Sequence, residues 1–177
     1  MSQTIFITGG ARSGKSRFSE QIATTFGTHL CYLATAQSLD DEMGQRINKH
    51  QQRRGDAWQT IEEPLHLAQT LAVNDGVFSV ILVDCMTLWL SNLLLLYEDL
   101  GEETETRLMD DVNRLATTLR GMTTPVIIVS NEVGMGIVPD NKLARMFRDI
   151  AGQANQILAA AASEAWLVAS GIPLKLK

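Results

Sequence analysis

A glycine-rich stretch near the amino terminus has the residue types and spacing of a phosphate-binding loop. Four residues separate Gly9 from Gly14, and Lys15 and Ser16 follow directly. Glycines let backbone N–H groups face phosphate oxygens, while Lys15 supplies a positive charge and the Ser16 hydroxyl a magnesium ligand. An apolar run before the loop and a helical pattern after it support a Walker A motif over a chance glycine turn. The motif predicts nucleotide contacts from Gly9, Gly10, Ala11, Arg12, Ser13, Gly14, Lys15 and Ser16.

A carboxylate stands at the end of another apolar run, Val80-Ile81-Leu82-Val83-Asp84. A buried strand that delivers an acid at its carboxyl end is typical of a Walker B segment, in which the acid lies beside the metal. An aspartate is also common at ordinary strand ends. The Walker A motif is what favours magnesium binding by Asp84 together with Ser16.

His50 differs from the other two histidines because Arg53 and Arg54 follow it closely. A neutral imidazole can attack phosphorus to form a phosphoramidate, and arginines can stabilise the charge that develops on the phosphates. The same residues suit the cationic last turn of a helix, which the helix dipole favours. Residue chemistry alone therefore favours the structural interpretation of His50.

Strand and helix patterns alternate along the chain. Apolar runs typical of strands cover residues 4–8, 30–34, 77–84, 126–130 and 165–169. Helical patterns extend from the glycine loop to residue 26 and cover residues 40–54, 65–73, 86–97, 102–120 and 141–162. Residues 172–176, joined through Ser170 and Gly171, are expected to form an antiparallel edge. The alternation predicts a single α/β domain over residues 1–177, with a mostly parallel sheet flanked by helices on both faces.

Composition excludes several classes of partner. The chain has 20 acidic and 15 basic residues, a formal charge of −5, and no basic face for nucleic acid. The apolar stretch at residues 86–97 is shorter than the roughly 20 residues that span a bilayer.

The first ten residues lack a signal or transit pattern, so a cytoplasmic location is expected. Cys31 and Cys85 lie in apolar runs without metal-ligand spacing, which predicts reduced, buried thiols.

A phosphate-binding loop does not identify the reaction, since switches, motors and kinases share it. A guanine-specific switch normally carries Asn-Lys-x-Asp, whereas this chain has Asn141-Lys142-Leu143-Ala144. An NTP-driven switch is therefore less favoured than an enzyme. A simple small-molecule kinase without a covalent intermediate stays open.

Several stretches together resemble one enzyme family, the bifunctional adenosylcobinamide kinases and adenosylcobinamide-phosphate guanylyltransferases of cobalamin nucleotide-loop assembly. The resemblance covers nearly the whole chain and rests on residues 8–16, 32–36, 40–43, 84–87, 131–139 and 148–152. Residues 131–139 are the most diagnostic, because ordinary P-loop kinases have nothing similar. This loop is a corrinoid or subunit contact, or else a glycine-rich connection, and its Glu132 would be a second acidic group at the site.

The resemblance implies a RecA-like P-loop fold, Mg²⁺, and two activities. One phosphorylates the aminopropanol hydroxyl of adenosylcobinamide with ATP or GTP. The other transfers GMP from GTP to adenosylcobinamide phosphate, giving adenosylcobinamide-GDP and pyrophosphate. A homotrimer is also implied.

The resemblance further assigns site residues. His50 falls on the histidine that carries GMP covalently, which makes it the predicted nucleophile, with Lys15 as the second catalytic residue. Lys49 precedes it where some relatives have a second histidine, and some relatives have Glu at the position of Asp84. Beyond the loop at residues 9–16, the implied nucleotide contacts are Thr35, Ala36, Gln37, Gln51, Gln52, Arg53, Arg54, Glu62 and Asp84.

Overall fold

The sheet carries seven strands in the computed structural model of the chain, which describes residues 3–36, 55 and 57–177. The strands are β1 (Thr4–Thr8), β2 (Leu30–Ala34), β3 (Trp58–Glu62), β4 (Val80–Asp84), β5 (Val126–Val129), β6 (Glu164–Ala169) and β7 (Ile172–Lys175). Their order is β3-β2-β4-β5-β1-β6-β7, and all neighbours are parallel except β6 and β7. The predicted mostly parallel sheet and its antiparallel edge are confirmed.

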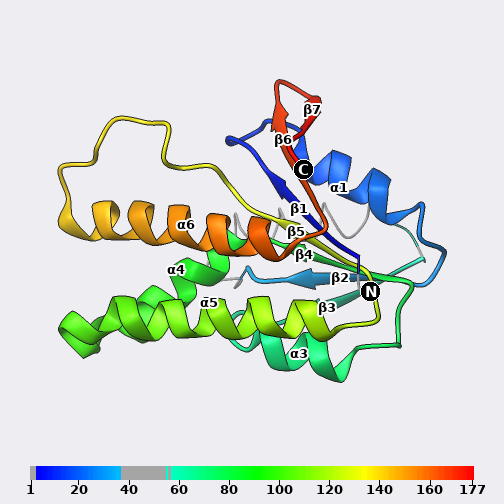
Figure 1. Cartoon of the computed structure of the whole chain (residues 1–177), viewed down its shortest axis with the longest axis horizontal. Coiled ribbons are helices and arrows are strands. Elements are labelled where there is room, and N and C mark those ends of the chain that lie inside the picture. Colours follow the sequence, from blue (N-terminus) through cyan, green and yellow to red (C-terminus); the bar gives the residue numbers. More distant parts are fainter. Residues whose placement is uncertain (1–2, 37–54, 56) are drawn as a thin grey trace.

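Helices cover both faces of this sheet (Figure 1). They are α1 (Lys15–Ala23), α3 (Leu67–Val73), α4 (Met86–Leu96), the 3₁₀ helix η1 (Glu98–Glu103), α5 (Thr104–Gly121) and α6 (Lys142–Ala161). Alternate strand residues point to opposite faces. Phe6 therefore joins the core beneath α3, α4, α5 and α6, whereas its neighbours Ile5 and Ile7 pack with Ala23 of α1 on the other face.

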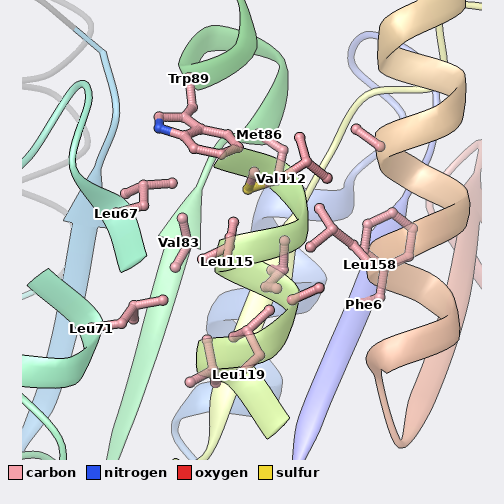
Figure 2. Close-up of a cluster of buried hydrophobic side chains, with 14 of the residues drawn as sticks. Phe6, Leu67, Leu71, Val83, Met86, Trp89, Val112, Leu115, Leu119 and Leu158 are labelled. Carbon is pink, nitrogen blue, oxygen red and sulfur yellow. The ribbon is translucent and has the colours of Figure 1, made fainter. Parts of the chain in front are cut away.

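The larger core lies under the four helices α3 to α6. Figure 2 shows Phe6 and Val83 of the sheet meeting helix side chains such as Trp89, Val112 and Leu158. Each fully buried apolar side chain contributes about 1.5–3 kcal/mol, so this face stabilises the sheet that positions the loops. Within the described residues, no helix is long and apolar enough to cross a membrane.

Two helices are shorter than the sequence pattern predicts. Helix α1 ends at Ala23 rather than near residue 26, because the Thr24 and Thr25 hydroxyls donate to carbonyls of the preceding turn. Helix α3 begins at Leu67 rather than residue 65, since the Glu63 carboxylate accepts the N–H groups of residues 65 and 66 in a turn. Local side-chain hydrogen bonds therefore set both boundaries.

Strand β4 is also shorter than predicted. It begins at Val80 and not at Val77, because the Val77 N–H donates to Asn74 O in a turn after α3. Val77 is 52% exposed, so its apolar side chain is not part of the buried run.

The other boundaries differ by a few residues at most. Residues 102–103 belong to η1, α5 begins at Thr104, and α6 begins after Asn141, whose side chain caps it. Residues 58–62 form the edge strand β3. The predicted helix over residues 40–54 lies outside the described residues. Cys31 and Cys85 are buried free thiols, as expected.

The strand register brings the predicted site residues to one edge. Ala34 lies opposite Asp84 and Glu62, and Asp84 lies opposite Val129. Ile7 pairs with Val129 in turn. The carboxyl ends of five parallel strands thus meet at one edge, which is where ligands bind in open α/β sheets.

Candidate active site

The glycine-rich loop joins β1 to α1 at the carboxyl edge of the sheet. Lys15, the first residue of α1, is only 7% exposed, and its Nζ donates to Gly10 O at 2.9 Å. Gly14 precedes the helix with φ of 99°, a conformation that side chains rarely adopt. The ammonium group is thus held inside the loop that is predicted to surround a phosphate.

Tertiary packing leaves little room for a side chain at two glycines of the loop. A Cβ at Gly9 would lie 2.4 Å from Val168 O, and one at Gly14 would lie 3.2 Å from Gly171 Cα. The Gly171 N–H also donates to Ser13 O at 2.8 Å. The β6–β7 hairpin therefore supports the outer side of the loop (Figure 1).

Two buried hydroxyls near the loop lack partners within the described part of the chain. These are Thr8 Oγ1 at the end of β1 and Ser13 Oγ inside the loop. Burying an unpaired hydroxyl is costly, and such groups are rare in native structures. Both groups are chemically suited to donate to phosphate oxygens, so the cradle fits the ligand that its sequence predicts.

Asp84 is fixed at the end of β4. The Tyr32 hydroxyl of β2 donates to Asp84 Oδ2 at 3.0 Å. Burial lowers the pKa of Lys15, and the negative charge of Asp84 opposes this effect, so the two side chains interact electrostatically. The structure thus brings the Walker A lysine and the Walker B acid together.

The Ser16 hydroxyl and the Asp84 carboxylate suit a magnesium ion that is also bound by phosphates, rather than a metal ion bound by protein side chains alone. Among the described residues, no three His, Cys, Asp or Glu side chains are placed to share a metal ion. Mg²⁺ usually takes one or two carboxylates, with phosphates and waters completing its shell. One hydroxyl and one carboxylate beside a phosphate cradle match that ligand set.

Thr35 lies next to Asp84 at the end of β2. Its hydroxyl donates to Cys85 O at 2.7 Å and accepts from Cys85 N at 2.8 Å. Asn92 Nδ2 of α4 donates to Thr35 O at 2.9 Å, which fixes the backbone after β2. The predicted contacts Thr35 and Ala36 are therefore positioned at the same edge as the phosphate cradle.

The other predicted contacts are more distant or undescribed. Glu62 is the last residue of β3, and β2 lies between β3 and the strand β4 that ends in Asp84. Neighbouring strands are about 4.8 Å apart, so the backbones of Glu62 and Asp84 are separated by two such spacings along the carboxyl edge. His50, Gln37, Gln51, Gln52, Arg53 and Arg54 lie outside the described residues.

Sequence reasoning missed a polar network behind the site. Ser130 Oγ donates to Asn155 Oδ1 at 2.6 Å, and Asn155 Nδ2 donates to Asn131 O at 3.2 Å. Asn131 Nδ2 in turn donates to Thr87 Oγ1 at 2.7 Å. One signal was available, because Asn155 interrupts the apolar face of α6 formed by residues 150, 151, 154 and 158. A buried amide at such a position indicates a fixed polar partner.

Comparison with solved structures supports the fold. The crystal structure of the RadB recombinase matches with a TM-score of 0.55 over 93% of this chain and 73% of that chain. Sequence identity is 13%, so this likeness concerns the fold alone. The chain has a RecA-like P-loop α/β fold, as the family resemblance implies.

Sequence comparison gives a more specific result. The "Bifunctional adenosylcobalamin biosynthesis protein CobU" of Escherichia coli (strain K12) is 43% identical over 180 residues, 98% of this chain and 99% of the relative. The corresponding protein CobP of Pseudomonas aeruginosa is 43% identical over 171 residues, 97% and 95% of the two chains. The family model described as "Cobinamide kinase / cobinamide phosphate guanyltransferase" matches residues 5–176. The chain therefore belongs to the cobinamide kinase / cobinamide phosphate guanyltransferase family.

Proposed function

We propose that this protein phosphorylates adenosylcobinamide and then transfers GMP from GTP to adenosylcobinamide phosphate. The observation that carries the proposal is the family match over residues 5–176, which includes the whole phosphate cradle and Asp84. The relatives CobU and CobP are named as bifunctional proteins of adenosylcobalamin biosynthesis. The products would be adenosylcobinamide-GDP and pyrophosphate.

The described residues suit phosphoryl transfer. Backbone N–H groups of the loop and the Lys15 ammonium would bind the β- and γ-phosphates of ATP or GTP. The Lys15 Nζ is held inside the loop at 2.9 Å from Gly10 O, so its charge needs little reorganisation. Mg²⁺ bound by Ser16 and Asp84 would neutralise charge on the transferred phosphate. Thr8 Oγ1 and Ser13 Oγ would gain partners on the same phosphates.

The guanylyl step is proposed to use His50. Its imidazole would attack the α-phosphorus of GTP, pyrophosphate would leave, and the bound GMP would pass to the acceptor phosphate. Arg53 and Arg54 would stabilise the phosphates during both transfers. This assignment rests on the family resemblance at residue 50.

Further parts of the proposal concern setting and assembly. We place the protein in the cytoplasm, in accord with its buried free thiols Cys31 and Cys85. We also propose that the protein forms a homotrimer. We further propose that it has no nucleic-acid partner, in accord with its net charge of −5. Size-exclusion chromatography with light scattering tests the trimer directly.

Intact-protein mass spectrometry tests the covalent step. The wild type and His50→Ala are incubated with GTP and Mg²⁺, with GTP labelled at the α-phosphate in a parallel sample. A GMP-sized, acid-labile adduct is expected on the wild type and not on His50→Ala.

The same samples distinguish the proposed function from the alternative one. A simple small-molecule kinase would phosphorylate its acceptor without retaining label from the α-phosphate on the protein. Absence of an adduct on folded protein that still phosphorylates adenosylcobinamide would contradict the His50 mechanism and favour that kinase.

A further inference from the structure

The segment after β5 lies between the two halves of the phosphate site. In the sheet, β5 is flanked by β1, which leads into the phosphate cradle, and by β4, which ends in Asp84. The Glu132 N–H donates to Gly9 O at 3.0 Å. Glu132 is therefore anchored directly against the first glycine of the cradle.

The backbone that carries Glu132 is held rigidly from behind. The hydrogen-bonded chain from Ser130 through Asn155 and Asn131 to Thr87 ties the end of β5 to α6 and to the first turn of α4. Ser130 and Asn155 are buried, and a satisfied buried network fixes one conformation. This network fixes the segment that carries residue 132 relative to α4, the helix that follows Asp84 in the chain.

Within the described residues, only one oxygen of the Glu132 carboxylate has a hydrogen-bond donor. Oε1 accepts the Gly134 N–H at 2.8 Å, and Glu132 is half-buried. No donor within residues 3–36, 55 and 57–177 reaches its Oε2, and no cation there pairs with the side chain. Asp84, by contrast, is held by Tyr32. A carboxylate oxygen that has no donor among the described residues, on a residue whose backbone is hydrogen-bonded to the phosphate cradle, is suited to accept a proton from a bound hydroxyl.

We propose that Glu132 is the general base for phosphorylation of the acceptor hydroxyl, an inference that rests on the proposed function. Oε2 takes the hydroxyl proton while the hydroxyl oxygen bonds to the γ-phosphorus. The bond from that phosphorus to the bridging oxygen breaks, and the nucleoside diphosphate leaves with the electron pair. The proton later passes from Glu132 to water when the products leave.

The two activities of the family allow a general-base role of Glu132 to be distinguished from a structural role. A phosphorylated acceptor already carries an anionic oxygen, so the guanylyl transfer has no hydroxyl proton to remove. Loss of a general base should therefore affect one reaction and spare the other. A damaged fold or cradle would lower both.

Glu132→Gln is the test, because the amide oxygen can still accept the Gly134 N–H. The full-length variant is assayed with adenosylcobinamide and ATP for the kinase step, and with adenosylcobinamide phosphate and GTP for the guanylyl step. Kinase kcat should fall by about 10²–10⁴-fold, whereas the KM for ATP and the rate of guanylyl transfer should change by less than about threefold. Glu105→Gln, the same change on the exposed face of α5, is the matched control and should leave both rates unchanged.

Each outcome decides the inference. Kinase activity within about threefold of the wild type would overturn the assignment, as would an equal fall in both reactions. A wild-type protein with neither activity would instead refute the proposed function itself, so the two failures are distinguishable.

Discussion

The amino ends of the adjacent strands β4 and β5 use polar residues differently from the carboxyl edge of the sheet. At their amino ends, Asp75 accepts hydrogen bonds from Thr123 N, Thr123 Oγ1 and Thr124 N, while Thr124 Oγ1 accepts from Gly76 N. At the carboxyl edge, the described structure leaves Ser13 Oγ and Thr8 Oγ1 buried without partners. One end is satisfied by the protein itself, and the other contains groups that fit a phosphate.

This contrast separates stabilising polar groups from ligand-binding groups. A carboxylate whose hydrogen bonds all go to the protein stabilises the fold, and hydrogen bonds from the Thr124 and Thr123 backbone lower the pKa of Asp75 to about 2. Lys15 differs, since burial lowers its pKa and thereby destabilises the charged form of the side chain rather than stabilising it. Substitutions at the amino ends should therefore change stability, whereas substitutions at the carboxyl edge should change nucleotide binding or activity.

Lys15→Met should give the largest effect. Removing the cation from the cradle should lower both activities by about 10²–10³-fold, because its charge stabilises the phosphates during transfer. The free energy of unfolding of the nucleotide-free protein should not fall, since the cost of burying the Lys15 charge outweighs its attraction to Asp84, and an apolar side chain of similar length removes that cost.

Steady-state kinetics and urea unfolding measure these two outcomes. Lys175→Met on the exposed edge strand β7 is the matched control and should retain both activities. A large loss of stability in Lys15→Met without nucleotide would show that the lysine mainly supports the fold rather than the bound phosphates.

Asp75→Asn should have the opposite pattern. It should lower the free energy of unfolding by about 1 kcal/mol at pH 7 and leave both activities unchanged, because its partners lie at the amino ends of the strands. Its pKa is lower in the folded protein than the ordinary 3.8, so the carboxylate contributes stability above that value.

This contribution should disappear as the pH falls from about 4 to about 2. Urea unfolding of wild type and variant across that range should give converging stabilities. A constant difference between the two proteins down to pH 2 would contradict the assigned role of the charge.

Ser13→Ala should give the smallest effect. Its Oγ is buried without a partner among the described residues, so removing it should leave the unliganded protein as stable as before or slightly more stable. Loss of one hydrogen bond to phosphate should weaken nucleotide binding by about 2–10-fold. Isothermal titration with a non-hydrolysable nucleotide measures this, and unchanged affinity would remove Ser13 from the cradle.

Local patterns allowed much of the fold to be predicted. The β1 to α1 loop, the alternation of strands with helices and the antiparallel edge follow from apolar periodicity and glycine spacing within short windows. Errors fell at boundaries such as residues 24–26 and 77–79, where side-chain hydrogen bonds or a turn ended an element earlier than its pattern. The roles assigned to His50 and residues 51–54 stay predictions.

The sequence by itself determined the phosphate cradle and, through the resemblance, the family. Residues 9–16 are contiguous, so the chemistry of the loop is visible without knowledge of the sheet. Only the tertiary structure decided that Val168 and Gly171 pack against this loop, and that Asn155 holds the segment carrying Glu132. These contacts join residues far apart in the chain, and strand order, which sequence periodicity does not encode, determines which of them meet.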